Sequence, residues 1–345
     1  RAARQADLIV GVGTRYSDFT TSSRTAFQNP DVRFVNINVA AFDAYKHGSS
    51  MPLVADARAA LIGLSSSLSL HQVSDEYREQ YTKDKVEWDA AVDSSFLDQQ
   101  LSEPSQAEII GAVQRSSDPR DVVICAAGSL PGDLHKLWRV RDQLGYHVEY
   151  GFSCMGYEIA GGIGVARADK TRDAIVMVGD GSYLMMHTEM VSAIAEGIKF
   201  IIVLIQNHGY ASIGHLSEDL GSQRYGTLYR FRDDAANNFE TGDTLPIDLA
   251  TNAESLGMNV IRVKPTENAI GDLRKAISEA KAAGRATLIH IHSNPFLYAP
   301  DGEGWWDVPV AEVSTLESTK SARKEYENSV KNQKKLLGKG AVERD

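Results

Sequence analysis

Short apolar runs of four to six residues recur along this chain, and helical stretches separate them. The clearest runs are Asp121-Val-Val-Ile-Cys-Ala, Ala174-Ile-Val-Met-Val, Phe200-Ile-Ile-Val-Leu-Ile and Thr287-Leu-Ile-His-Ile. A strand that lacks polar alternation is covered on both faces, which is typical of a parallel sheet between two layers of helices. We therefore expect the α/β fold class, with two doubly wound parallel sheets.

The pattern divides the 345 residues into four segments. Residues 1–70 form a first α/β domain, and residues 71–105 are a polar helical linker. Residues 106–300 form a second α/β domain, and residues 301–345 are a charged helical tail that we expect to be solvated. The opening residues resemble a helix end running into a strand, so we expect the chain to be the carboxyl-terminal part of a longer protein.

Composition excludes several classes of function. The formal net charge of −10 disfavours binding to nucleic acid, because an acidic surface repels phosphate backbones. The two cysteines, Cys125 and Cys154, do not make a disulfide framework. The apolar runs are too short to span a membrane. We expect a cytoplasmic enzyme with no nucleic-acid or membrane partner.

Two polar clusters follow neighbouring apolar runs and carry the strongest chemical signal. They are Gly179-Asp180-Gly181-Ser182 and Gln206-Asn207-His208-Gly209. Ligands of open α/β sheets bind beyond the carboxyl ends of the strands, and a right-handed crossover could make these two strands neighbours. The Asp180 carboxylate, the Asn207 amide oxygen and the Gly209 backbone carbonyl are hard oxygen ligands of the kind that Mg²⁺ prefers.

The first cluster also suits an anionic group. Gly179 and Gly181 allow close approach of the backbone, and the N–H groups of a helix beginning near Ser182 would point at the anion. The alternative is a plain turn between strand and helix. A Gly-Asp-Gly sequence alone does not decide between the two, but Asn207 at the end of the next strand favours a site.

Together the two clusters resemble the diphosphate signature of the thiamine-diphosphate enzymes. That signature is Gly-Asp-Gly, then about two dozen residues, then Asn-Asn, whose second Asn binds the metal. Here the pair reads Gln206-Asn207, so the metal ligand is retained. The resemblance implies that thiamine diphosphate and Mg²⁺ are the cofactors. It also implies that residues 106–300 are the diphosphate-binding domain and residues 1–70 part of a middle Rossmann-like domain.

Further strings match the same family. Glu149-Tyr-Gly-Phe-Ser-Cys-Met-Gly resembles the loop whose bulky apolar residue wedges between the cofactor rings, a role that falls here to Met155. The Ser153 carbonyl would accept from the aminopyrimidine. Gly128 and Ser129, in Ala126-Ala-Gly-Ser-Leu-Pro-Gly-Asp, occupy the loop that helps hold the diphosphate. The alternative for Met155 is an ordinary core residue.

Longer strings are similar to one branch of the family, the trihydroxycyclohexane-1,2-dione hydrolases of inositol breakdown. They are Gly13-Thr-Arg-Tyr-Ser-Asp-Phe-Thr-Thr, Val35-Asn-Ile-Asn-Val, Ala126-Ala-Gly-Ser-Leu-Pro-Gly-Asp-Leu-His-Lys-Leu-Trp, Gly221-Ser-Gln-Arg and Trp305-Trp-Asp-Val-Pro. This branch implies hydrolytic cleavage of a carbon–carbon bond in a cyclic polyhydroxy 1,2-diketone. It also implies a homodimer or homotetramer with the site at the subunit interface.

Several roles stay open at this point. His208 is a candidate for proton transfer, or it packs the turn. Residues 210–232 look like a polar loop that closes over substrate. The glutamate that activates the cofactor in the family has no counterpart among Glu149, Glu158 and Glu189, so we expect the chain alone to be inactive. Gly11-Val-Gly13 lacks the full dinucleotide fingerprint, and we do not expect FAD to bind.

Three alternatives compete with the hydrolase. An acetolactate-synthase-like carboligase or a 2-oxo-acid decarboxylase would keep the cofactor and change the reaction, and a decarboxylase would release CO₂. A cofactor-binding or assembly fragment would keep the fold without activity. A nicotinamide dehydrogenase is the weakest alternative, because the first glycine turn is incomplete.

Overall fold

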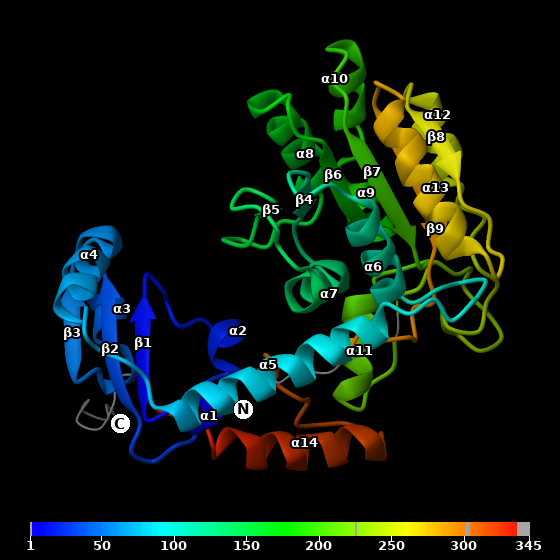
Figure 1. Ribbon diagram of the computed structural model, residues 1–345. Helices are drawn as coiled ribbons and strands as arrows, with labels where there is room; N and C mark the ends of the chain where they lie inside the picture. Colours follow the sequence, from blue (N-terminus) through cyan, green and yellow to red (C-terminus); the bar gives the residue numbers. More distant parts are fainter. Residues whose placement is uncertain (1, 225, 301–303, 337–345) are drawn as a thin grey trace. The chain divides into compact units, whose positions relative to one another are not determined.

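The computed structural model describes residues 2–224, 226–300 and 304–336, which fall into two compact units (Figure 1). The first unit combines Arg1–Trp88 with Asp301–Asp345, and the second is Asp89–Pro300. Each unit is built on one parallel sheet, so the predicted α/β fold class is confirmed. Among the described residues, no helix has the length and apolar character needed to cross a membrane.

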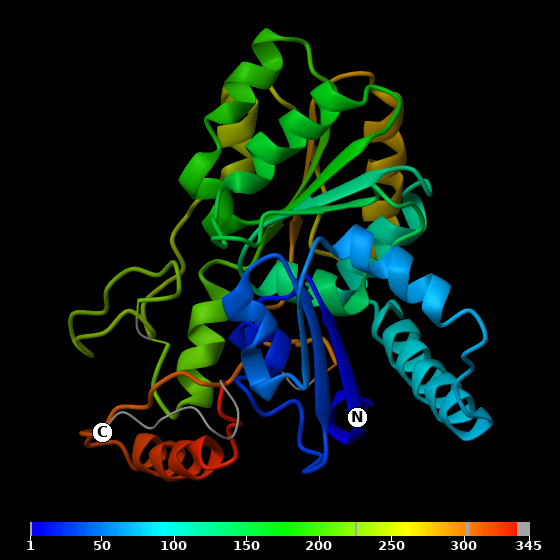
Figure 2. The same cartoon turned by 90° about the vertical axis from the view of Figure 1, so that its left-hand side faces the viewer.

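The first unit has a three-stranded sheet in the order β1-β2-β3, seen as adjacent blue strands in Figure 2. Its elements in chain order are α1 (Ala2–Gln5), β1 (Leu8–Val12), α2 (Asp18–Thr21), β2 (Arg33–Asn38), α3 (Ala41–Ala44), the 3-10 helix η1 (Lys46–Gly48), β3 (Met51–Val54), α4 (Ala57–Ser67), the first part of α5 (Asp75–Ser95) and α14 (Glu317–Val330). A small aromatic core around Tyr16, Phe27 and Phe34 packs beside the sheet.

The side chain of Tyr16 fills the space beside the glycine turn that follows β1. A Cβ at Gly11 would overlap the hydroxyl of Tyr16, and that hydroxyl donates to Asn36 Oδ1 at 2.6 Å. Gly13 has φ = 65°, a conformation that favours glycine. Packing and turn geometry therefore account for both glycines.

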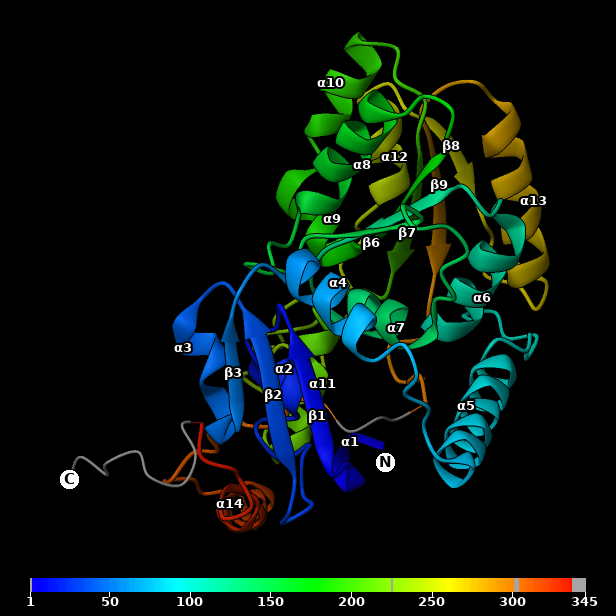
Figure 3. The ribbon, with the colours of Figure 1, turned by 60° about the vertical axis from the view of Figure 1, so that its left-hand side comes forward.

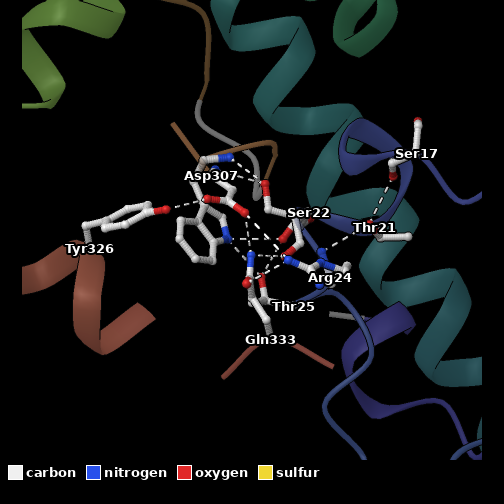
Figure 4. Close-up of polar contacts among 10 residues, drawn as sticks. Ser17, Thr21, Ser22, Arg24, Thr25, Asp307, Tyr326 and Gln333 are labelled. Carbon is white, nitrogen blue, oxygen red and sulfur yellow. Dashed lines mark hydrogen bonds and ion pairs between the residues drawn. The ribbon is translucent and has the colours of Figure 1, made fainter. Parts of the chain in front are cut away.

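The carboxyl-terminal segment docks on the loop after α2 (Figure 4). The indole N–H of Trp306 donates to the Ser22 carbonyl and to Thr25 Oγ1, both at 3.1 Å. Ser23 Oγ accepts the backbone N–H groups of Trp306 and Asp307 at 3.1 and 3.0 Å. These bonds hold a loop in which Ser22, Ser23 and the next residue all have positive φ.

The tail is therefore more than a solvated helix. Helix α14 keeps most of its side chains exposed, but Tyr326 donates to Asp307 Oδ1 at 2.9 Å. Gln333 donates to Asp307 Oδ2 at 2.7 Å and accepts from Arg24 at 2.8 Å. Within the predicted tail of residues 301–345, the helix ends at Val330, and residues 301–303 and 337–345 lie outside the described residues.

The second unit has a six-stranded parallel sheet in the order β5-β4-β6-β7-β9-β8, of which Figure 3 labels β6, β7, β9 and β8. Its elements in chain order are α6 (Gln106–Ser116), β4 (Val122–Cys125), α7 (Ser129–Leu137), β5 (Tyr146–Val148), α8 (Tyr157–Ala168), β6 (Ala174–Gly179), α9 (Asp180–Met186), α10 (Glu189–Ala195), β7 (Ile201–Gln206), α11 (Ala211–Asp219), α12 (Leu249–Ser255), β8 (Asn259–Arg262), α13 (Ala269–Ala282) and β9 (Thr287–His292).

Alternate residues of the strands feed two separate apolar cores. Val123, Ile175 and Val203 pack with α6, α7 and α13 on one face of the sheet. Ile124 and Val176 pack with α8, α9, α10 and α12 on the other. Burial on both faces explains why these strands read as continuous apolar runs in the sequence.

Helices α9 and α10 are separate, although the chain between them keeps a right-handed helical conformation. One segment differs from the sequence prediction. Residues 210–232 were expected to be a polar loop, but α11 occupies the first part. The irregular chain after α11 extends away from the sheet in Figure 2.

Candidate functional site

The site lies where the sheet changes winding direction. Strand β4 is flanked by β5 on one side and β6 on the other. The helix after β4, α7, packs on one face of the sheet, and the helix after β6, α9, packs on the opposite face. The two connections therefore diverge beyond the carboxyl ends of β4 and β6, and this is the usual ligand position in such folds.

Asp180 directly follows β6 and faces the turn that follows β7. These strands are paired in register, with Gly179 opposite Ile205. Asp180 Oδ1 accepts the N–H of Gly181 at 2.9 Å, while Oδ2 accepts the N–H groups of Asn207 and Gly209 at 3.1 and 3.3 Å. The carboxylate thus organises the turn that contains the two other predicted metal ligands.

Burial sets the electrostatics of this carboxyl. Asp180 is 1% exposed, and desolvation raises its pKa from 3.8 to about 6. Backbone N–H donors from His208, Gly209, Gly181 and Asn207 oppose the rise, since they stabilise the charged form. A buried carboxylate with partial compensation favours a bound cation.

The Asn207 side chain supplies a further acceptor. Its Oδ1 is buried and has no hydrogen-bond partner among the described residues. Buried polar atoms are nearly always satisfied, so an unpaired amide oxygen beside a carboxylate fits an oxygen-ligated metal such as Mg²⁺.

The turn itself is tightly fixed around these ligands. His208 lies in the left-handed region with φ = 60°. A Cβ at Gly209 would overlap the Thr227 carbonyl, and that carbonyl accepts the N–H of Tyr210 at 2.7 Å. The glycine is therefore required by the close approach of residues 227–228.

Two glycines at the carboxyl ends of β4 and β6 border open space. A Cβ at Gly128 or Gly179 would meet no atom of a residue beyond its chain neighbours within 4 Å, and Gly128 has φ = 118°. Ser129 begins α7, and Ser182 lies buried within α9. Gly181 differs, because a Cβ there would crowd the ring of Tyr210.

Met155 lies beside the first polar cluster. Its Cε is 3.5 Å from the position that a Cβ on Gly181 would take. Ser153, two residues earlier, has φ = 54°, and the Glu149 carboxylate accepts the N–H groups of Phe152 and Cys154 at 3.0 and 2.7 Å. The loop is thus braced from within, with the methionine at the site.

The structure therefore brings five of the predicted residues together. Asp180 accepts hydrogen bonds from the backbone of Gly181, Asn207 and Gly209, and Met155 lies beside Gly181. Gly128, Ser129 and Ser153 belong to loops at the same end of the sheet, and no hydrogen bond joins them to that group among the described residues. His208 lies between Asn207 and Gly209 in the same turn and is half-buried, and its ring stacks on that of His292 with the ring centroids 5.3 Å apart.

Comparison with known proteins matches this arrangement. Residues 126–291 match the family model for the C-terminal binding domain of thiamine pyrophosphate enzymes, and residues 1–64 match the model for their central domain. The chain belongs to the thiamine pyrophosphate enzymes. Thiamine pyrophosphate is the same compound as thiamine diphosphate, so the predicted family is confirmed, and its domains support thiamine diphosphate as the cofactor.

Curated members of this thiamine pyrophosphate family align along nearly the whole chain. Two 3D-(3,5/4)-trihydroxycyclohexane-1,2-dione hydrolases of one Bacillus cereus strain are 34% and 35% identical over 357 and 354 residues. A protein of the same name from Bacillus thuringiensis (strain Al Hakam) is 34% identical over 354 residues. Each alignment covers 96% of this chain and 54% of the relative. The chain thus spans about half the length of these curated relatives.

Three residues near this site were given no role in it from the sequence. Glu158 is 1% exposed, and its Oε2 accepts the N–H of Gly156 at 2.9 Å, next to Met155. Burial raises its pKa, and a hydrogen bond from Ser182 opposes the rise. The other two are Gln206 and His290, whose Oε1 and Nε2 atoms lie 2.6 Å apart. A glutamate early in a helix and a histidine in a strand carry no local signal, because their partners come from other loops.

Proposed function

We propose that this chain supplies the diphosphate-binding part of a thiamine-diphosphate-dependent hydrolase, which cleaves a carbon–carbon bond in a cyclic polyhydroxy 1,2-diketone. One observation carries the cofactor part. The Asp180 carboxylate binds the backbone of the turn that presents the buried, unpaired Asn207 Oδ1. The names of the relatives, at 34–35% identity, support the substrate class.

In this proposal Mg²⁺ is held by Asp180, Asn207 and the backbone carbonyl of Gly209. The open Cβ positions at Gly128 and Gly179 leave room for the diphosphate, with Ser129, Gly181 and Ser182 alongside. When bound, thiamine diphosphate supplies the carbanion stabilisation that breaking a carbon–carbon bond beside a carbonyl requires. The chain itself binds, orients and shields the reacting groups.

Met155 is proposed to press between the two cofactor rings and hold them bent. Its flexible thioether fills irregular gaps, and its position beside Gly181 suits that role. The Ser153 carbonyl would accept from the aminopyrimidine, and His208 would donate or transfer a proton. The domain limits 1–70 and 106–300, the subunit-interface site and the cytoplasmic location stay predictions.

Calorimetry of thiamine diphosphate binding tests the cofactor part. We expect binding by the wild-type chain with Mg²⁺ and none with a chelator. Asp180→Asn should weaken binding about 100-fold, because a buried charged ligand is worth about 2–5 kcal/mol. Asp272→Asn, on the exposed side of α13, is the matched control and should bind as the wild type does. Equal affinity in the wild type and Asp180→Asn would contradict the site.

A product assay tests the reaction. The complete protein that contains this chain is incubated with the cyclic diketone, thiamine diphosphate and Mg²⁺. We expect a ring-opened acid and no CO₂. Release of CO₂ from a 2-oxo acid, without turnover of the diketone, would favour the decarboxylase instead.

A further inference from the structure

Three polar side chains are joined at the carboxyl ends of β7 and β9. These strands are paired, with Leu204 opposite His290 and Gln206 opposite His292. His290 Nε2 lies 2.6 Å from Gln206 Oε1, and Gln206 Nε2 lies 3.2 Å from His208 Nδ1. Gln206 and His290 are 2% and 8% exposed, so water does not replace these bonds.

The backbone fixes which way the Gln206 amide faces. Its Nε2 also lies 3.5 Å from the carbonyl oxygen of Ile247. A carbonyl can only accept, so the atom that faces both Ile247 and His208 is the amide nitrogen. That nitrogen donates to His208 Nδ1, which must then carry no proton. The amide oxygen accepts the Nε2–H of His290 on the other side.

The length of the glutamine side chain matters. An asparagine at position 206 would draw the amide back by about one carbon–carbon bond, ~1.5 Å, and could not keep both imidazole contacts at these distances. Position 206 is also where the sequence departs from the Asn-Asn signature. The departure therefore comes with a pair of histidine partners.

We propose that His290 and Gln206 are positioning residues that hold His208 with its proton on Nε2, so that His208 donates a hydrogen bond to an oxygen beside the metal-binding turn. Nε2 lies across the ring from Nδ1, so it points away from Gln206. The His208 ring also stacks on the His292 ring, with the two ring centroids 5.3 Å apart, and this contact restricts its motion. The nature of the acceptor, a cofactor phosphate or a substrate carbonyl, rests on the proposed function; the tautomer does not.

The tautomer is measurable in the ¹⁵N-labelled full chain without cofactor. Two-bond ¹H–¹⁵N correlation separates Nε2–H from Nδ1–H imidazoles, and the loss of signals in His208→Gln assigns the residue. We expect His208 to be the Nε2–H tautomer. A His208 that carries its proton on Nδ1 in the wild-type chain overturns the proposal, whatever the chain binds.

Variants then test the two positioning residues. In Gln206→Glu the carboxylate can only accept, so the proton should move to Nδ1 and the tautomer should reverse. His290→Phe removes the anchor of the amide, and His208 should then populate both tautomers. His215 on α11, whose side chain is 40% exposed, is the internal control, and its tautomer should not change. If the variants fold and all keep the wild-type tautomer of His208, Gln206 and His290 do not position its proton, since packing alone does not select a tautomer.

Ligand additions identify the acceptor. A change in the His208 Nε2 signal on adding thiamine diphosphate with Mg²⁺ indicates a phosphate oxygen. A change that needs the cyclic diketone as well indicates a substrate oxygen. If calorimetry shows both ligands bound and neither moves the signal, the donor role is wrong. If neither ligand binds, the proposed function fails while the tautomer result stands.

Discussion

Replacing Asp180 by asparagine separates the cost of burying this carboxylate from its role as a ligand. Asp180 is 1% exposed, and burial raises its pKa from 3.8 to about 6. One pKa unit corresponds to about 1.36 kcal/mol, so ionised Asp180 makes the metal-free folded chain less stable by about 3 kcal/mol than a carboxyl with an unshifted pKa.

The sign of the pH dependence follows from the raised pKa. As the pH rises, the unfolded chain loses this proton first, near the ordinary pKa, and the folded chain loses it only near pH 6. The metal-free wild type is therefore destabilised by this group from about pH 4 upward. Between about pH 4.5 and about pH 7.5 the change is about 2 kcal/mol, and it levels off above the folded-state pKa.

Asparagine does not titrate, so the difference in stability between the variant and the wild type isolates this group. Two backbone N–H donors lose their carboxylate acceptor, which costs the variant about 1 kcal/mol each at either pH. Urea unfolding with a chelator should show the difference moving by about 2 kcal/mol in favour of Asp180→Asn at the higher pH. An equal difference at both pH values would refute the reasoning, and Asp272→Asn should show none.

Three further predictions concern packing around the site and the tail. Gly181→Ala crowds the ring of Tyr210, so it should cost about 1–3 kcal/mol in urea unfolding and weaken cofactor binding. Gly164→Ala, at an exposed position of α8 with open space around it, should be neutral or stabilising. Trp306→Phe removes the indole N–H that holds the Ser22 loop, so about 1–2 kcal/mol should be lost, and an unchanged stability would contradict the docking. Arg224→Met breaks the ion pair of Arg224 with Glu218 of α11. Hydrogen exchange in α11 should therefore rise, while exchange in β7 stays unchanged. Equal exchange in α11 of the variant and the wild type would argue against this anchor.

Local sequence patterns were sufficient to predict the sheet and the meeting of Asp180 with the turn at Asn207. The strands around Val176 and Val203 are buried on both faces, so their apolar runs were visible without any partner. The approach of Asp180 to Asn207 followed from one crossover between adjacent strands. Both features depend on short stretches of chain and on the handedness of a single connection.

Contacts between distant parts of the sequence were not predictable in the same way. Helix α11 has weak apolar periodicity, and its Gly214 is buried by Arg224 and Thr227 rather than by a face of its own. Trp306 meets Ser23 across 283 positions of sequence. Gln206 looked like a conservative departure from the signature until His290, 84 positions away, supplied its partner.

The coordination of one metal ion tests the central claim most directly. Crystals grown with thiamine diphosphate and Mn²⁺, which binds oxygen ligands as Mg²⁺ does, would locate the ion by its anomalous scattering. We predict a single peak within about 2.2 Å of a carboxylate oxygen of Asp180 and of Asn207 Oδ1, with the diphosphate on its open side. A bound cofactor whose metal lies elsewhere, with both side chains out of coordinating distance, would contradict the site.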